Sequence, residues 1–214
     1  MPPKAPKGEY IETDTGNKIS RRSLIHGTQH IILGGKTVIQ SDAVIRGDLY
    51  RSSSSSSSHK PTPSTASTAT SGAASTAQQQ PQQTPSVAIT IGRYSYISRQ
   101  AILRPPSRLH RGVYAFYPLK IGDHVFVGER AVVEAASVGN HVHIGRDAVV
   151  GSMAILKDFA YVLDGAVVAP GMVVPSWCVV GGAPARIVGE VGEGYGVEGA
   201  EGGMARERYR VVGR

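Results

Sequence analysis

Aliphatic residues recur at every sixth position through most of the second half of the chain. The unbroken run is Val138, Ile144, Val150, Leu156, Val162, Val168, Val174 and Val180, and shorter runs begin at Leu33, Ile91 and Ile121. Because six is an even number, these side chains all point to one side of an extended chain. In an α-helix a six-residue step would turn the side chain by about 240°, away from any common face. The spacing therefore predicts short strands that bury one side.

The residues between these aliphatic positions complete a six-residue repeat. The position two before each aliphatic residue is small or aliphatic, as at Ala131, Ala148 and Cys178, and glycine often follows, as at Gly128 and Gly145. Large and small side chains in alternation fit a narrow, tapered interior. Three such hexads make one coil, so the pattern predicts an all-β fold, a parallel β-helix of hexapeptide repeats with five to six coils. The repeat resembles that of left-handed β-helices, and the left hand is inferred from this resemblance alone.

Composition divides the chain into a repeat domain and its flanking and inserted segments. The expected parts are an N-terminal arm at 1–30, the β-helix domain at 31–191, an insertion at 52–86, a loop at 104–120 and a Gly-rich tail at 192–214. The insertion consists largely of Ser, Thr, Ala, Gln and Pro, which bury too little apolar surface to offset the entropy of ordering, so we expect it to be disordered. We expect the tail to be flexible, with a short terminal helix at Met204–Val212.

Charge and cysteine content restrict the possible partners. The chain carries 23 Lys and Arg against 16 Asp and Glu, a net charge of +7, but its basic residues are dispersed and form no stripe. We therefore expect an acidic protein partner and no nucleic acid. The single Cys178 allows no internal disulfide and favours a reducing compartment. No apolar run reaches the roughly 20 residues of a membrane span, and the N-terminus has no signal-peptide pattern, so we expect no direct membrane insertion.

Two classes of hexapeptide β-helix are enzymes, and each needs residues that can be sought here. Gamma-class carbonic anhydrases hold zinc with three imidazoles. Matching that family's pattern places Arg104, Glu129 and Glu134 at these positions, a set better suited to ion pairs than to zinc. No Ser, Thr or Cys stands in a recognisable nucleophile motif for acyl transfer. We expect no catalytic residue, metal or cofactor; the alternative is a homotrimeric carbonic-anhydrase-like or hexapeptide acyltransferase enzyme.

Aromatic and histidine residues recur once per coil on one predicted face. Tyr94, His124, His141, Phe159 and Trp177 make one row, the 94–177 row, and Tyr96, Phe126, His143 and Tyr161 make a second, the 96–161 row. Coil stacking should place each ring above the next, and such cross-strand pairs stabilise a sheet. Aromatic side chains are also frequent anchors of protein interfaces. We predict that these nine residues, together called the aromatic ladder, form a partner-binding site, with a purely structural stack as the equal alternative.

Several segments outside the repeats carry a more selective resemblance. They are Glu9-Tyr10-Ile11-Glu12-Thr13, Gly16-Asn17-Lys18-Ile19-Ser20-Arg21, Ile45-Arg46-Gly47-Asp48-Leu49, Arg104-Pro105-Pro106, Phe116-Tyr117-Pro118-Leu119 and Ile121-Gly122-Asp123-His124-Val125. From about Glu9 to Val191, apart from the insertion, the chain resembles the dynactin subunit 5 family, the small left-handed β-helix subunits of the dynactin pointed-end complex. The insertion departs from the family pattern, and so does a Gly-rich tail where the family has a C-terminal helix.

This resemblance implies a function that the repeats alone do not give. It implies a non-catalytic dynactin subunit that supports dynein-dependent microtubule transport and the attachment of cargo such as early endosomes. The implied partners are a second β-helix subunit, a larger zinc-binding subunit, a pointed-end actin-related protein and dynein cargo adaptors. The implied location is the cytoplasm, at the cytoskeleton.

Overall fold

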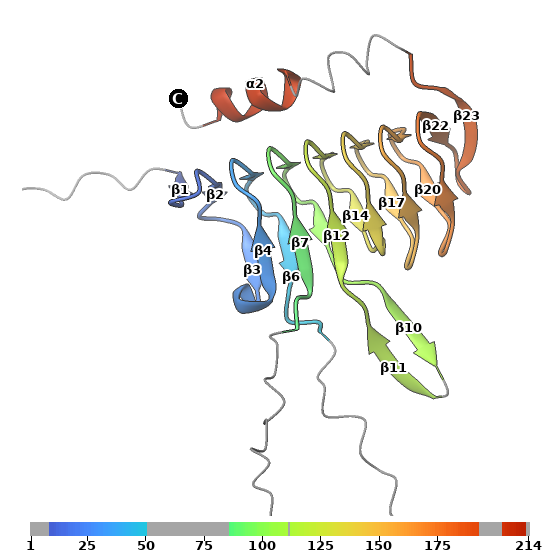
Figure 1. Cartoon of the computed structure of the whole chain (residues 1–214), viewed down its shortest axis with the longest axis horizontal. Helices are drawn as coiled ribbons and strands as arrows, with labels where there is room; N and C mark the ends of the chain where they lie inside the picture. The colour runs from blue at the N-terminus through green and yellow to red at the C-terminus, as the bar shows by residue number, and fades with distance from the viewer. Residues whose placement is uncertain (1–8, 51–85, 111, 193–202, 213–214) are drawn as a thin grey trace, which may run out of the picture.

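Three sheets wrap around one core in the computed structural model of the chain, which describes residues 9–50, 86–110, 112–192 and 203–212. Consecutive strands pass from sheet to sheet, and each pairs in parallel with the equivalent strand one coil later, as Phe126 does with His143. The fold is the left-handed parallel β-helix that the sequence predicts. Figure 1 shows the coils stacked along the long axis, with a hairpin projecting on one side and a helix above the coils.

The strands of the three sheets are short. The first sheet contains β1 (Tyr10–Glu12), β2 (Lys18–Ser20), β5 (Val38–Ile39), β8 (Tyr96–Ile97), β13 (Phe126–Val127), β16 (His143–Ile144), β19 (Tyr161–Val162), β22 (Cys178–Gly181) and β23 (Arg186–Glu190). The second contains β3 (Leu24–His26), β6 (Val44–Arg46), β9 (Ile102–Leu103), β14 (Val132–Val133), β17 (Val149–Val150) and β20 (Val167–Val168). The third contains β4 (Ile31–Leu33), β7 (Ile89–Ile91), β12 (Leu119–Ile121), β15 (Ser137–Val138), β18 (Ile155–Leu156) and β21 (Val173–Val174).

The core follows the predicted register. The hexad aliphatics Val133 and Val150 are 0% exposed, and so are the small residues two positions earlier, Ala131 and Ala148. Glycine after the aliphatic has a steric reason: a Cβ on Gly128 would lie 2.5 Å from the backbone carbon of Gly145 in the next coil. Only a residue without a side chain lets the corners of adjacent coils approach so closely.

The β-helix begins earlier than the sequence analysis expects. Strands β2 and β3 fall within residues 1–30 but pair in parallel with β5 and β6, so strand stacking starts at Lys18 and not at Ile31. Ile19 and Ile25 keep the six-residue spacing, whereas Leu33, the next residue in register, comes eight positions after Ile25. The turn η1 (Thr28–His30) lies in this longer step and hides the register of the first coil.

Two segments, the insertion and the loop 104–120, leave the β-helix at the corner between the second and third sheets. The insertion 52–86 follows β6 and precedes β7, and its expected disorder concerns residues that, except for Ser86, lie outside the described ones. The loop 104–120 contains an antiparallel hairpin of β10 (Ser107–His110) and β11 (Val113–Phe116). At the base of this hairpin the Ser107 N–H donates to Ser152 Oγ at 3.1 Å, and the Ser152 hydroxyl donates to Ser107 O at 2.9 Å.

The terminal helix predicted at Met204–Val212 is present as α2 (Gly203–Val211). It lies over the N-terminal part of the first sheet (Figure 1). Lys18 Nζ donates to the carbonyl oxygen of Tyr209 at 3.1 Å, the Tyr209 hydroxyl donates to Gly16 O at 2.7 Å, and Val212 is buried. The tail therefore carries a folded helix after its Gly-rich stretch, whose residues 193–202 lie outside the described ones. Within the described residues, no helix is long and apolar enough to cross a membrane.

Candidate protein-binding site

The 96–161 row stands on consecutive strands of the first sheet. Tyr96, Phe126, His143 and Tyr161 come from β8, β13, β16 and β19, and each is in register with the next. Their ring centroids are 5.7, 4.7 and 4.3 Å apart along the row, with nearly parallel planes. These are the distances of stacked aromatic pairs, each of which contributes about 0.5–1.5 kcal/mol beyond simple burial.

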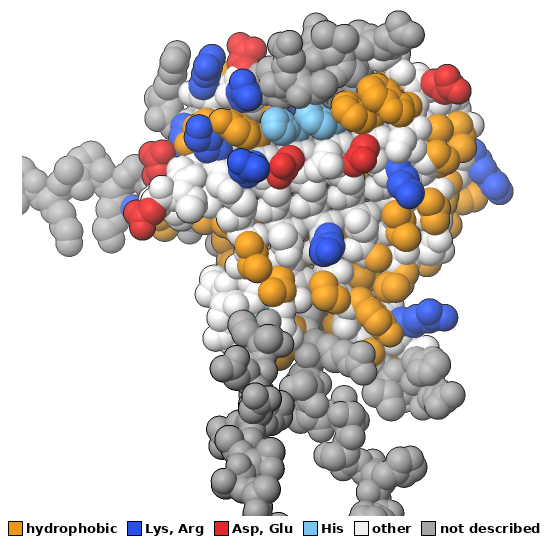
Figure 2. All heavy atoms as spheres, viewed as in Figure 1, with side chains coloured by type: hydrophobic (Ala, Val, Ile, Leu, Met, Phe, Trp, Pro, Cys, Tyr) orange, Lys and Arg blue, Asp and Glu red, His pale blue; other side chains and the backbone are white. Residues whose placement is uncertain are grey.

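The 94–177 row lies at the corner that precedes this sheet. Its five residues all have left-handed backbone, with φ between 54° and 64° at Tyr94, His124, His141, Phe159 and Trp177. The corner geometry imposes this conformation, which residues other than glycine seldom adopt. Successive rings are 5.4, 4.7, 4.8 and 4.0 Å apart. Figure 2 shows histidine side chains in a row with hydrophobic ones across this part of the surface.

The predicted one-coil stacking of both rows is confirmed, while their partner-binding role stays a prediction. The structure also shows that helix α2 covers part of the aromatic ladder, which the sequence analysis did not predict. Arg208 of α2 lies over the Phe126 ring, 4.1 Å from its centroid, and Arg206 lies 5.7 Å from that of Tyr94. The Tyr209 ring meets Tyr94 edge-on at 6.3 Å. The N-terminal half of the aromatic ladder thus already binds a helix of its own chain through cation–π and aromatic contacts.

A row of alternating charges runs beside the 96–161 row. Arg99, Glu129, Arg146 and Asp164 each stand two residues after a core aliphatic of the first sheet, and we call them the charged row. Arg99 Nε lies 3.4 Å from Glu129 Oε1, and Arg146 Nε lies 3.5 Å from Asp164 Oδ2. The sequence analysis missed this row, although its signal, opposite charges at one hexad position in successive coils, is present in the sequence.

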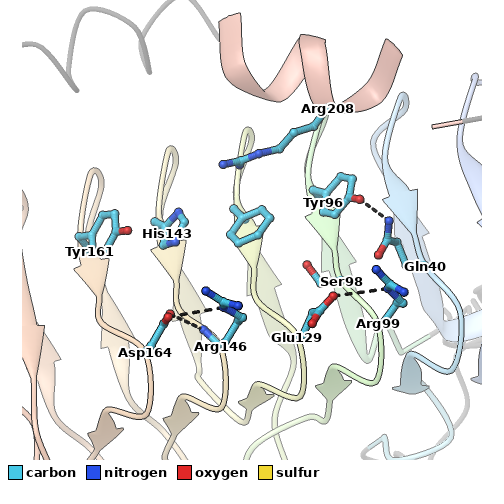
Figure 3. A pocket seen from close by; sticks show the side chains of 11 residues that line it. Gln40, Tyr96, Ser98, Arg99, Glu129, His143, Arg146, Tyr161, Asp164 and Arg208 are labelled. Carbon is cyan, nitrogen blue, oxygen red and sulfur yellow. Dashed lines mark hydrogen bonds and ion pairs between the residues drawn. The ribbon is translucent and has the colours of Figure 1, made fainter. Parts of the chain in front are cut away.

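A groove of about 460 Å³ lies between these elements. The 96–161 row and the charged row line it together with Gln40, Ser98 and Arg208. Figure 3 shows Arg208 reaching down from α2, while Arg99 and Arg146 stand on the opposite side among their carboxylate partners. The Gln40 amide nitrogen donates to the Tyr96 hydroxyl at one end. A chain segment entering this groove would meet rings, guanidinium groups and carboxylates.

Burial controls the ionisation of the rings in the groove. Burial, and after it the nearby Arg208 guanidinium, together lower the pKa of His143 from 6.5 to about 4. Burial also raises the pKa of Tyr96, with the Tyr10 phenol as a second cause. Burial, followed by the neighbouring His141, lowers the pKa of His124. His143 is therefore neutral at pH 7 and acts as one more uncharged ring in the stack.

The three residues that match the carbonic-anhydrase metal positions do not meet at one point. Arg104 and Glu134 form the expected ion pair, but Glu129 pairs instead with Arg99. The reason is that Glu129 precedes strand β14 whereas Glu134 follows it, at the same end as Arg104 after β9. Two carboxylates that are each held by a guanidinium do not fit zinc, which takes neutral imidazoles, thiolates or unpaired carboxylates. In the part of the chain that the structure describes, no three His, Cys, Asp or Glu side chains gather as a metal site would require.

Fold and site together define the class of protein: a hexapeptide-repeat β-helix with an aromatic ladder along its first sheet. A family model described as Dynactin subunit 5 matches residues 4–59 and 83–197. The chain therefore belongs to the dynactin subunit 5 family. The unmatched residues between these two ranges fall within the insertion, as the sequence analysis expects.

Individual relatives agree with this family and with the fold. Dynactin subunit 5 of Dictyostelium discoideum is 34% identical over 134 residues, 63% of this chain and 49% of that protein, so the chain matches about half of its relative's length. A hexapeptide transferase family protein from Anaplasma phagocytophilum has a TM-score of 0.56 at 16% identity, covering 92% of both chains. AntD, an N-acyltransferase from Bacillus cereus, has a TM-score of 0.59 at 13% identity, covering 89% of both chains. At these identities the likeness to the two structures shows the fold alone.

Proposed function

We propose that the chain is a non-catalytic subunit of the dynactin complex, located in its pointed-end assembly. Its work is to hold partners together and so to support dynein-dependent microtubule transport and the attachment of cargo such as early endosomes. The observation that carries this proposal is family membership over most of the chain, residues 4–59 and 83–197. The paired state of Glu129 and Glu134 supports a binding role over metal-dependent catalysis.

The proposed partners are those of a pointed-end subunit. They are a second β-helix subunit, a larger zinc-binding subunit, a pointed-end actin-related protein and dynein cargo adaptors, met in the cytoplasm at the cytoskeleton. We assign docking to the C-terminal half of the aromatic ladder, Phe159, Trp177 and Tyr161. Trp177 is 41% exposed although its ring stacks on Phe159 at 4.0 Å. A large exposed ring at the end of a rigid stack is a suitable interface anchor, because little side-chain entropy remains to be lost on binding.

The test is purification of the tagged chain from its own cells, followed by identification of the chains that co-purify. We expect dynactin subunits at constant proportion through a salt wash and a sizing column. Recovery of the folded chain without any dynactin subunit would overturn the proposal.

The enzyme alternative makes a different prediction for the same sample. A carbonic-anhydrase-like enzyme would be a trimer with stoichiometric zinc, which light scattering and metal analysis detect together. We expect less than about 0.1 zinc per chain, because the residues at the matching positions are engaged in ion pairs. A trimer with one zinc per chain would favour the enzyme.

A further inference from the structure

The 94–177 row ends in a tryptophan with one occupied face. The Trp177 ring stacks on Phe159, with 4.0 Å between the ring centroids and 7° between the ring planes. In the part of the chain that the structure describes, no further ring stacks on Trp177. Because the residue is exposed, a large part of the indole remains accessible to a ligand.

Helix α2 shows which side chains this ladder binds. The guanidinium of Arg206 lies 5.7 Å from the Tyr94 ring centroid, and that of Arg208 lies 4.1 Å from the Phe126 centroid. Lys36 supplies a third cation, with its Nζ 5.3 Å from the Tyr94 centroid. Figure 1 shows α2 above the N-terminal coils and β22, which follows Trp177, at the opposite end of the β-helix. The covered half of the ladder therefore binds cations.

The exposed half has a better acceptor for a cation than the covered half. Within the described residues, neither Phe159 nor Trp177 receives a cation–π contact. The negative face of an aromatic ring attracts a cation, most strongly for tryptophan and more so when water is excluded. A planar guanidinium can also stack flat on such a ring. Because Phe159 already holds the indole in place, a ligand would immobilise little additional side-chain freedom.

A carboxylate stands beside the ring row in both halves of the ladder. Asp123 and Asp158 each come one residue before a ring of the 94–177 row. Asp158 is exposed, and its Oδ1 accepts hydrogen bonds from the backbone N–H and the side-chain amide of Asn140, at 2.6 and 3.2 Å. The backbone N–H of Trp177 donates to the carbonyl oxygen of Asp158 at 3.3 Å, so the two residues are neighbours in adjacent coils. The second carboxylate oxygen of Asp158 can therefore accept from a guanidinium that lies on the indole.

We propose that the exposed end of the 94–177 row binds an arginine side chain of a partner segment, with the guanidinium on the indole of Trp177 and its N–H groups directed to the Asp158 carboxylate. The C-terminal half of the ladder then makes with another chain the kind of contact that the N-terminal half makes with α2. The segment is basic where it meets the ladder, although the net charge of +7 favours partners that are acidic overall. The assignment rests on the proposed docking function and names the chemistry of one contact.

The experiment uses the full-length chain, in which Trp177 is the only tryptophan, so that indole fluorescence reports on this site. The probe is a nine-residue peptide with three arginines among alanine and serine residues. Two comparison peptides carry citrulline or tyrosine in place of arginine. Citrulline keeps the shape of the side chain and removes its charge, whereas tyrosine offers a ring that could extend the stack.

Two variants test the site, and each has a matched control. Trp177→Leu removes the indole, and Asp158→Asn removes the charge while keeping the oxygen that accepts from Asn140. The control for the first is Tyr114→Leu, which removes an exposed ring of the hairpin. The control for the second is Lys157→Gln, which removes the exposed charge next to Asp158 in sequence. Circular dichroism verifies that all four variants are folded, and anisotropy of fluorescein-labelled peptide measures their affinities.

We expect a saturable change of Trp177 fluorescence with the arginine peptide. The affinity should fall at least fivefold for Trp177→Leu and at least threefold for Asp158→Asn, and change less than twofold for the controls. The citrulline and tyrosine peptides should bind at least fivefold more weakly than the arginine peptide. The inference is overturned if either comparison peptide binds as tightly as the arginine peptide, if Trp177→Leu binds like the wild type, or if no saturable change occurs.

This outcome is separate from that of the proposed function. If the arginine peptide does not bind while the wild-type chain still co-purifies with dynactin subunits, only the chemistry assigned to the contact is wrong. If the peptide binds as expected and no dynactin subunit co-purifies, the proposed function is wrong and the arginine site stands.

Discussion

The two halves of the aromatic ladder have the same construction and different surroundings. In the N-terminal half, Tyr94 and Phe126 stack with their neighbours and also receive Arg206 and Arg208 from α2. In the C-terminal half, Phe159 and Trp177 stack more closely, at 4.0 Å, yet Trp177 is 41% exposed. Among the described residues, the ring contacts between α2 and the ladder lie at Tyr94 and Phe126 and not in this half. Stacking of the rings is therefore a property of the repeat and occurs in both halves. The two halves differ in that helix α2 binds only to the N-terminal one.

The helix on the N-terminal half shows what kind of contact this surface accepts. α2 is anchored by hydrogen bonds to Lys18 and Gly16 at the start of the β-helix, and its arginines lie over rings farther along. A short, basic helix has little helical stability of its own, since helices below about 12 residues are marginal in water. The rings and Lys18 thus stabilise α2 in place. The exposed half presents a similar ladder, and we propose that a segment of another chain binds there.

The largest expected effect is the loss of the whole fold, and with it both halves of the aromatic ladder. Val150→Asp puts a charge into the core between them, where Val150 is 0% exposed, and should cost more than about 4 kcal/mol, enough to prevent folding. The control is Val149→Asp on the same strand, because Val149 points outward and is 37% exposed. Circular dichroism and yield of soluble protein compare the two. A folded Val150→Asp chain would mean that the register is wrong by one residue.

The next effect is a pH dependence that belongs to the covered half. The folded pKa of His143, about 4, is below its unfolded value of 6.5. The unfolded chain therefore binds more protons between these values, so stability is fully present above pH 6.5 and decreases as pH falls to 4, by about 3 kcal/mol. The free energy of unfolding, measured with urea across this range, should decrease more steeply with falling pH for the wild type than for His143→Phe.

The matched control for this pH experiment is His26→Phe, since His26 is exposed on β3. The pH dependence due to His143 should remain in this variant, because the stack around His143 is unchanged. If His143→Phe and the wild type have the same slope between pH 4 and 6.5, the ring of His143 is not excluded from water in the way described.

Removing α2 should make the covered half resemble the exposed half. A chain ending at residue 202 loses the contacts of Arg206, Arg208 and Tyr209 with the ladder, worth about 1–2 kcal/mol together. Hydrogen exchange should increase at β8 and β13, beneath the helix, and remain unchanged at β20 and β21. A uniform increase along the whole β-helix would instead indicate that α2 stabilises the entire fold.

The smallest effect is expected from the insertion, whose flanking strands β6 and β7 belong to the second and third sheets and not to the first sheet, which carries the 96–161 row. Residues 52–85 can be replaced by a short Gly/Ser turn while Ser86 is kept, because His30 Nδ1 and the Ser86 carbonyl oxygen lie at hydrogen-bond distance, 2.8 Å. Loop-closure entropy changes slowly with length, so the free energy of unfolding should change by less than about 1 kcal/mol. A loss above about 2 kcal/mol in thermal unfolding would show that the segment is structural.

The repeat made the core and the ladder predictable, because one even spacing determines both which residues are buried and which stack. The first coil was missed, because the eight-residue step from Ile25 to Leu33 breaks that spacing. The placement of α2 was not predictable either. Its contacts join Arg208 to Phe126 and Tyr209 to Gly16, pairs that are far apart in sequence and share no periodic pattern. The charged row, in contrast, was available in the sequence as opposite charges at one hexad position.

The most direct test of the account is co-purification with the double variant Phe159→Ser/Trp177→Ser, which changes only the exposed half of the ladder. We expect the variant to keep the circular dichroism of the wild type but to lose at least nine-tenths of its dynactin partners. Val173→Ser is the matched control, since Val173 is 51% exposed on a different sheet, and it should keep them. If the folded double variant recovers every partner at the wild-type yield, the C-terminal half of the ladder is a structural stack and not a docking site.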